Sequence, residues 1–264
     1  MINLPWVSSR YGRGASYAAA PAAPAGSAKV TRQDDLTAWW KCEDETEEIG
    51  DYDLTLNNGA AILSGGATSG SSNALDCDGT NDYAISSAFD LDSGTAISIS
   101  MWLKSDGAYT AGGNPTYEVN GYYGCANLTN STSTLTDVTV GFGQYTASRM
   151  FMWYRMDGGS WTSTTATNYQ DAGWDAQDWT LWTMTWASGN TFKLYRNDNS
   201  TPVCTSASTV TGTLYDTTSL QFMLAKPPQY SWYMECRWDD IRVYGIELST
   251  SEISDIYNSG SGDW

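Results

Sequence analysis

The stretch from Trp238 to Tyr257 constrains the fold of this chain more than any other part of the sequence. Residues 238–244 alternate in character with a period of two, which predicts a β-strand that ends at Gly245. Such a strand is expected to place Trp238, Asp240, Arg242 and Tyr244 on one face and Asp239, Ile241 and Val243 on the other.

A short helix is predicted directly after this strand. Ser249 is followed three residues later by Glu252, which is the capping-box pattern. Ile253, Ile256 and Tyr257 then fall on one helical face. Because so short a helix is not stable alone, we expect it to lie against the rest of the protein.

From Leu36 onward the chain reads as short strands separated by turns, without a long helical period. Trp182, Met184 and Trp186 share one face of an alternating run and are expected to face the core. The pattern predicts an all-β, antiparallel two-sheet sandwich with one short C-terminal helix. Strands are expected within 36–41, 52–56, 74–85, 96–104, 138–145, 150–156, 179–186, 191–196, 219–225 and 231–244.

The first 35 residues differ from this β domain, which covers 36–258 before a polar tail at 259–264. They are rich in Ala, Pro, Gly and Ser, and they are basic, because the first acid is Asp34. This composition cannot form a core and predicts either a frayed terminus or an extended arm that docks on a neighbouring subunit. The candidate docking residues are Trp6, Arg10, Tyr11, Arg13 and Tyr17.

The formal net charge of −17 makes nucleic acid and anionic membranes unfavourable partners. The chain has no His and no CxxC spacing among its 5 Cys, which argues against a zinc site and a His-dependent catalytic triad. Residues 1–29 lack the basic and apolar regions of a signal peptide. We therefore expect assembly in a reducing cytoplasm, with the cysteines as small buried hydrophobes.

Two segments rich in Tyr, Gly, Ser, Thr and Asn, 105–137 and 157–178, interrupt the strand pattern and are expected to be long loops. Exposed Trp and Tyr with Asn and Asp nearby are suited to sugar rings, although such residues also make protein contacts. The candidate ligand-binding residues are Tyr109, Tyr117, Tyr122, Tyr123, Trp161, Tyr169 and Trp174.

Several of these pieces, in this order, resemble the laminin-G-like, concanavalin A-like lectin jelly roll, in particular the LamG modules of phage and bacterial surface proteins. The resemblance covers about 36–258 and implies two packed sheets in which the first and last strands meet. It does not imply an activity, because this fold hosts binders, enzymes and scaffolds. The matching segments are 36–39, 73–83, 97–104, 179–186, 192–198, 239–244 and 248–257.

Glycoside hydrolases of this architecture carry paired catalytic carboxylates on one strand. The acidic run 43–48 lacks that spacing and lacks the apolar alternation of a strand, so we expect a solvated turn and no catalysis. The resemblance also suggests a structural calcium, which needs several oxygen ligands. The candidate metal ligands are Asp78, Asp82 and Asp240, the last together with Glu43 or Asp51.

Taken together, the sequence predicts a non-enzymatic virion structural protein of a bacteriophage, such as a capsid decoration, fibre or tail-associated subunit. Its arm would dock on other virion proteins, its lectin-like head would bind a host surface glycan, and a homo-oligomer is expected. The alternative is a carbohydrate-binding module or adhesin at a microbial cell surface.

Overall fold

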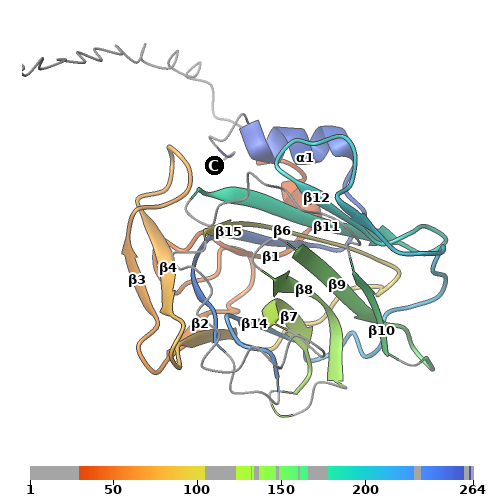
Figure 1. Cartoon of the computed structure of the whole chain (residues 1–264), viewed down its shortest axis with the longest axis horizontal. Helices are drawn as coiled ribbons and strands as arrows, with labels where there is room; N and C mark the ends of the chain where they lie inside the picture. The colour runs from red at the N-terminus through yellow and green to blue at the C-terminus, as the bar shows by residue number, and fades with distance from the viewer. Residues whose placement is uncertain are drawn as a thin grey trace, which may run out of the picture.

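The chain folds into two antiparallel sheets packed face to face, as predicted (Figure 1). The structure is a computed structural model. Among the residues that it describes, no helix has the length and apolar character needed to cross a membrane. It describes residues 30–104, 123–131, 133, 137–146, 149–159, 161–165, 178–228, 233–258 and 262.

The first sheet, sheet A, has the strand order β13-β12-β11-β6-β15-β4-β3, and β1 also pairs with β15. Strand β15 lies inside this sheet, where it pairs with β6, β4 and β1. Its strands are β1 (Leu36–Trp40), β3 (Ala61–Ser64), β4 (Asn73–Asp78), β6 (Ala96–Lys104), β11 (Thr180–Ala187), β12 (Lys193–Arg196), β13 (Cys204–Thr205) and β15 (Glu235–Tyr244).

The second sheet, sheet B, has the order β10-β9-β8-β7-β14-β5-β2. Two of its strands, β7 and β10, lie in segments that the sequence predicts as loops; they are strands because neighbouring strands supply their hydrogen bonds. Its strands are β2 (Leu54–Asn57), β5 (Tyr83–Ser86), β7 (Tyr123–Thr129), β8 (Val138–Thr146), β9 (Arg149–Arg155), β10 (Trp161–Thr165) and β14 (Gln221–Leu224).

The first and last strands meet, as the resemblance implies. β1 runs antiparallel to β15, with Leu36 opposite Tyr244 and Trp40 opposite Ile241. A 3-10 turn, η1 (Gln33–Asp35), leads into β1. The pairing of β1 with β15 therefore joins segments about 200 residues apart in the sequence within sheet A.

The strict alternation predicted for 238–244 is wrong at one point. The β15–β6 register shifts between Asp239 and Arg242, and Asp240 has the left-handed φ of 46°. This bulge inserts an extra residue, so Trp238 faces the core together with Ile241 and Val243. Arg242 and Tyr244 keep to the opposite face of the sheet.

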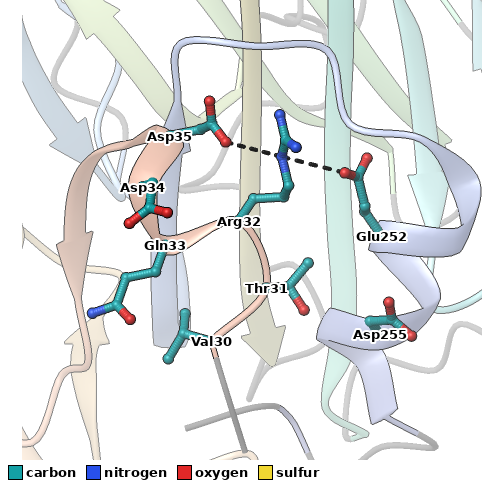
Figure 2. A pocket seen from close by; sticks show the side chains of 8 residues that line it. All are labelled: Val30, Thr31, Arg32, Gln33, Asp34, Asp35, Glu252 and Asp255. Atoms are coloured by element: carbon teal, nitrogen blue, oxygen red, sulfur yellow. Dashed lines mark ion pairs between the residues drawn. The ribbon is translucent and has the colours of Figure 1, made fainter.

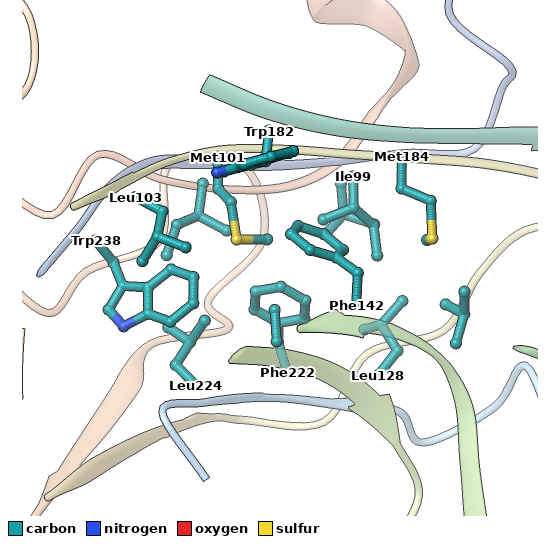
Figure 3. Close-up of a cluster of buried hydrophobic side chains, with 14 of the residues drawn as sticks. Ile99, Met101, Leu103, Leu128, Phe142, Trp182, Met184, Phe222, Leu224 and Trp238 are labelled. Atoms are coloured by element: carbon teal, nitrogen blue, oxygen red, sulfur yellow. The ribbon is translucent and has the colours of Figure 1, made fainter. Parts of the chain in front are cut away.

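Large side chains from the two sheets interdigitate to form the core (Figure 3). Trp182 and Met184 of β11 are fully buried there, as the alternation predicts. In the described part of the chain, Cys42, Cys77, Cys204 and Cys236 are buried thiols outside any disulfide, as expected of small hydrophobic residues. From sheet B, the core receives Leu128, Phe142, Phe222 and Leu224.

Helix α1 (Thr250–Tyr257) lies on the outer side of sheet A (Figure 1). Its capping box between Ser249 and Glu252 is formed as predicted. Ile253 and Ile256 pack on outward-facing residues of sheet A, and the Tyr257 ring stacks on Trp102 with centroids 5.6 Å apart. The outer face of sheet A is therefore occupied by the chain's own helix.

Candidate functional site

The outer face of sheet B is the other broad surface of the sandwich, and the strand registers define a row of residues across it. Trp153 of β9 lies opposite Gly141 of β8, which lies opposite Asn127 of β7. Asn127 lies opposite Met223 of β14, which lies opposite Ile85 of β5. These residues point away from the core because the alternate positions on each strand face it.

The middle of this row is tightly packed. A Cβ on Gly141 would approach the Trp153 ring to 2.7 Å and the Ala126 carbonyl oxygen to 2.6 Å, so only glycine fits beneath the indole. Trp153, Asn127 and Met223 are buried although they are outside the core clusters. The Asn127 amide donates to the Lys226 carbonyl over 3.3 Å, whereas its buried Oδ1 has no hydrogen-bond partner.

A cluster of two tyrosines and one lysine stands at one end of this row. The rings of Tyr83, at the start of β5, and Tyr233, just before β15, have centroids 6.5 Å apart. The Lys226 ammonium lies 4.7 Å from the Tyr83 centroid and 5.9 Å from the Tyr233 centroid. All three side chains are half-buried, so part of each ring remains open to solvent. We call these three residues the Tyr83–Lys226–Tyr233 cluster.

A short backbone turn places this lysine between the rings. Ala225 adopts the left-handed φ of 63°, which ends β14 and turns the chain. The Met234 N–H donates to the Ala225 carbonyl over 3.0 Å, and this bond brings Tyr233 back beside Lys226. Pro227 favours an extended conformation for the residue before it. The cluster is therefore held by backbone contacts as well as by the rings.

Acidic residues are distributed unevenly between the two sheets. The strands of sheet B contain no Asp or Glu, although the chain has 30 acidic residues. In sheet A, strands β4 and β15 carry Asp76, Asp78, Glu235, Asp239 and Asp240. The strands of sheet B thus differ in charge from the rest of an acidic protein.

The residues predicted to bind ligand are largely beyond the described part of the chain. Tyr123 and Trp161 open β7 and β10 instead of lying in loops, and the placement of their side chains is not described. Tyr109, Tyr117, Tyr122, Tyr169 and Trp174 lie outside the described residues, as do the docking-arm residues Trp6, Arg10, Tyr11, Arg13 and Tyr17.

Sequence reasoning missed the Tyr83–Lys226–Tyr233 cluster. The sequence singles out Tyr83 only as part of the segment 73–83, and nothing local connects it to residues 140 or more positions away. One signal was present in the sequence: Lys226 is a cation in an acidic chain, it precedes two prolines, and Tyr233 follows nearby.

The predicted calcium ligands mostly bind backbone groups. Asp82 is buried and accepts from the Asp78 N–H over 3.2 Å, and burial raises the pKa of its carboxyl. Glu43 accepts from the Ser72 N–H over 2.5 Å, and Asp51 is exposed. Among the described residues, no group of three or more His, Cys, Asp or Glu side chains is arranged to hold a metal ion. Calcium binding stays a prediction.

Asp240 is instead part of a buried polar cluster. Its Oδ1 accepts from Arg242 Nε and from Trp39 Nε1, both over 2.7 Å, and its Oδ2 accepts from Arg242 Nη2 over 2.9 Å. The Arg242 guanidinium also lies 4.9 Å from the Trp39 ring centroid. Both oxygens of the Asp240 carboxylate therefore accept hydrogen bonds from Arg242, and Oδ1 also accepts one from Trp39.

The acidic run 43–48 forms a turn, but it is not fully solvated. Glu47 is buried and accepts from the backbone N–H groups of Trp39, Ile49 and Gly50. Asp44 accepts from the hydroxyl and the N–H of Thr46, and these hydrogen bonds hold the pKa of Asp44 below its usual value. These two carboxylates are thus used to hold the turn.

A cavity of 330 Å³ lies between η1 and α1 (Figure 2). Arg32 spans it, with Nε 2.9 Å from an Asp35 oxygen and 3.3 Å from a Glu252 oxygen. Asp34 and Asp255 add two further carboxylates to the lining. The cavity contains none of the predicted site residues, and its ion pairs join the entry to β1 with the helix.

Solved structures share this fold at low sequence identity. The binding domain of Paraclostridial Mosquitocidal Protein 1 has a TM-score of 0.60 at 14% identity, covering 86% of this chain and 52% of that one. The receptor binding domain of botulinum neurotoxin C/D mosaic serotype has a TM-score of 0.57 at 13% identity, covering 86% and 51%. The chain therefore spans about half the length of these binding domains.

A third similar structure is matched almost over its whole length. It is domain 4 of an extracellular arabinanase from Geobacillus stearothermophilus, in complex with arabinotriose. Its TM-score is 0.51 at 15% identity, covering 84% of this chain and 97% of that one. Likeness at this level of identity shows the fold.

Among curated proteins, none matches this sequence. A family model does match, over residues 78–254, which is well over half of the chain and includes most of the strands of both sheets. Together with the sandwich topology, this match shows that the chain belongs to the Laminin_G_3 family of the concanavalin A-like lectin/glucanases superfamily.

Proposed function

We propose that this chain is a non-catalytic glycan-binding module and that its binding surface is the Tyr83–Lys226–Tyr233 cluster at the edge of sheet B, because the middle of that sheet's outer face is buried. The observation that carries the proposal is the half-exposed ring pair of Tyr83, which starts β5 of sheet B, and Tyr233, which lies just before β15, with the Lys226 ammonium between them. Aromatic rings with polar groups beside them are the usual contact surface for a ligand with one apolar face and several hydroxyls. The arabinotriose complex of the similar arabinanase domain supports a sugar as the ligand.

The experiment is a glycan array with the full chain, followed by calorimetry on the glycans that bind. Tyr83→Ala and Tyr233→Ala should each weaken binding by about 5-fold or more, because the sugar ring loses a stacking partner that contributes about 1 kcal/mol. Tyr257→Ala is the matched control, because that tyrosine is also half-buried but stacks on Trp102 beside sheet A. A blank array at high protein concentration, or equal losses in the control, would contradict the proposal.

The absence of catalysis is part of the proposal. It is supported by the structural use of Glu47 and Asp44 in the acidic turn. Any glycan that binds should be recovered intact after long incubation with the protein. Appearance of shortened fragments, in a preparation of wild-type protein but not of the Tyr83→Ala variant, would show an enzyme.

We further propose a virion subunit as the setting of this module, with a microbial surface adhesin as the alternative. This proposal depends on the arm, where Arg10, Arg13 and Lys29 occur without an acid, while the remaining residues hold all 30 acidic side chains. Deleting residues 1–29, which spares the buried Val30 and the ion-paired Arg32, should abolish incorporation into particles and leave glycan binding unchanged. Normal incorporation of the truncated protein would rule out docking through the arm.

A further inference from the structure

The cation of the Tyr83–Lys226–Tyr233 cluster differs from two other described lysines, which are paired with carboxylates. Lys41 lies 3.5 Å from Glu48, and Lys193 lies 3.0 Å from Glu247. Within the described residues, Lys226 makes no ion pair, and its contacts are the two tyrosine rings and its backbone bond to Asn127. In a chain with 13 basic and 30 acidic residues, an ammonium without a carboxylate partner is unexpected from composition alone.

The carboxylates that are nearest in sequence do not neutralise it. Asp82 precedes Tyr83, but alternation turns its side chain to the other side of the strand, where it is buried and accepts from the Asp78 N–H. Glu235 follows Tyr233 at the start of β15, in sheet A. Within the described residues, neither of these carboxylates forms an ion pair with Lys226, so the charge within the cluster is that of the ammonium.

The cluster also offers several hydrogen-bond donors. The ammonium carries three donors, and each tyrosine adds a phenol O–H. The turn at Ala225 and the hydrogen bond from Asn127 hold the lysine backbone, so less freedom is lost when a ligand binds. The ammonium would repel a cationic ligand, and a neutral sugar would form no ion pair with it.

We infer that this site takes an acidic sugar, with the sugar ring against Tyr83 and Tyr233 and its carboxylate paired with the Lys226 ammonium. This inference rests on the proposed glycan-binding function and specifies its ligand class. A hydrogen bond between charged groups is stronger than one between neutral groups, so the carboxylate accounts for much of the selectivity.

The test uses uronic-acid oligosaccharides, such as trigalacturonate and triglucuronate, each paired with its methyl ester. The ring and linkage are the same in each pair, and only the charge differs. Wild-type full chain should bind at least one acid about 10-fold or more tightly than its ester, and this preference should weaken as salt is raised. Lys226→Met should remove the preference, and Lys226→Arg should retain most of it.

Lys41→Met is the matched control, because Lys41 also lies over an aromatic ring, 4.5 Å from the Trp39 centroid, but on the sheet A side. This control should leave the acid preference unchanged. Binding of neutral glycans or esters as tightly as acids, with the same affinity in Lys226→Met, would overturn the inference and leave the proposed function standing. An array that is blank for acidic and neutral glycans alike would overturn both.

Discussion

Asp240 and Arg242 form an ion pair two residues apart on β15, with both side chains fully buried. The pair exists because the bulge at Asp240 turns its carboxylate toward the guanidinium instead of along the strand. Trp39 of β1 completes the cluster by donating its indole N–H to Asp240. The contact between the first and last strands thus contains buried charges at its centre.

We predict that Arg242→Met lowers the free energy of unfolding by about 3–5 kcal/mol, because it leaves the Asp240 carboxylate buried without its cation. The double variant Asp240→Asn with Arg242→Met should recover part of this loss. Urea denaturation measures both. Lys193→Met is the control, since it removes a half-exposed pair with Glu247 and should change stability by about 1 kcal/mol or less. Equal losses in the two single variants would contradict the prediction.

The second prediction concerns Asp239, which accepts from the Ala67 N–H and the Ser71 hydroxyl and whose Oδ1 is buried without a partner. Burial, with the neighbouring Asp240 carboxylate, raises the pKa of Asp239 to about 7. A group whose pKa is raised on folding stabilises the fold fully below its unfolded value, and this stabilisation is lost as pH rises through about 7. Asp239→Asn should therefore gain stability relative to wild type between pH 5 and pH 8.

The comparison uses urea denaturation of both proteins across this pH range. Asp44→Asn provides a control whose stability difference from wild type should stay constant across this range. Hydrogen bonds from Thr46 hold the pKa of Asp44 low, so its stabilisation is present at neutral pH and is lost on acidification. Parallel stability profiles for wild type and Asp239→Asn would show that Asp239 does not titrate in this range.

A third prediction tests how α1 is held on sheet A. Ser249→Ala should reduce stability by about 1 kcal/mol, because it removes the acceptor for the Glu252 N–H. The helix should loosen first, exposing Trp102 beneath Tyr257, which quenching of tryptophan fluorescence would detect. Ser254→Ala, at an exposed position inside the helix, should leave stability the same or slightly higher.

A fourth prediction concerns the glycine under Trp153. Gly141→Ala should cost about 1–3 kcal/mol, because the new methyl group overlaps the indole and the Ala126 carbonyl oxygen. Gly245→Ala is the control, since the nearest atom to its new methyl group would be the Thr37 hydroxyl oxygen at an ordinary 3.7 Å. Thermal unfolding of the two variants gives the comparison, and a neutral Gly141→Ala would show that the Trp153 ring can shift freely.

Much of the fold could be predicted from local patterns, and the exceptions have physical causes. Alternation correctly assigned Trp182 and Met184 to the core, and the capping box correctly placed the start of α1. Alternation failed at Asp240, because a β-bulge depends on pairing with the partner strand and does not change the alternating pattern of the sequence. Alternation also failed to predict β7. The conformation of this strand depends more on its pairing with β14 and β8 than on its own residues.

The candidate site was harder to predict than the fold. Alternation indicates which face of a strand a side chain occupies, but it does not say which strands become neighbours. Tyr83, Lys226 and Tyr233 meet only because β5 pairs with β14 and the chain then turns back into β15. The acid-free character of sheet B likewise becomes visible only when seven separate segments are assembled in one sheet.

The position of β15 has a consequence for how this protein is made. It is the last strand to leave the ribosome, yet it lies inside sheet A and supplies hydrogen bonds to β6, β4 and β1. Until residues 235–244 have been synthesised, those three strands have an unpaired edge that is open to other nascent chains. Folding of the domain must therefore wait until β15 has left the ribosome, and products that terminate before β15 should aggregate instead of forming a smaller stable sandwich.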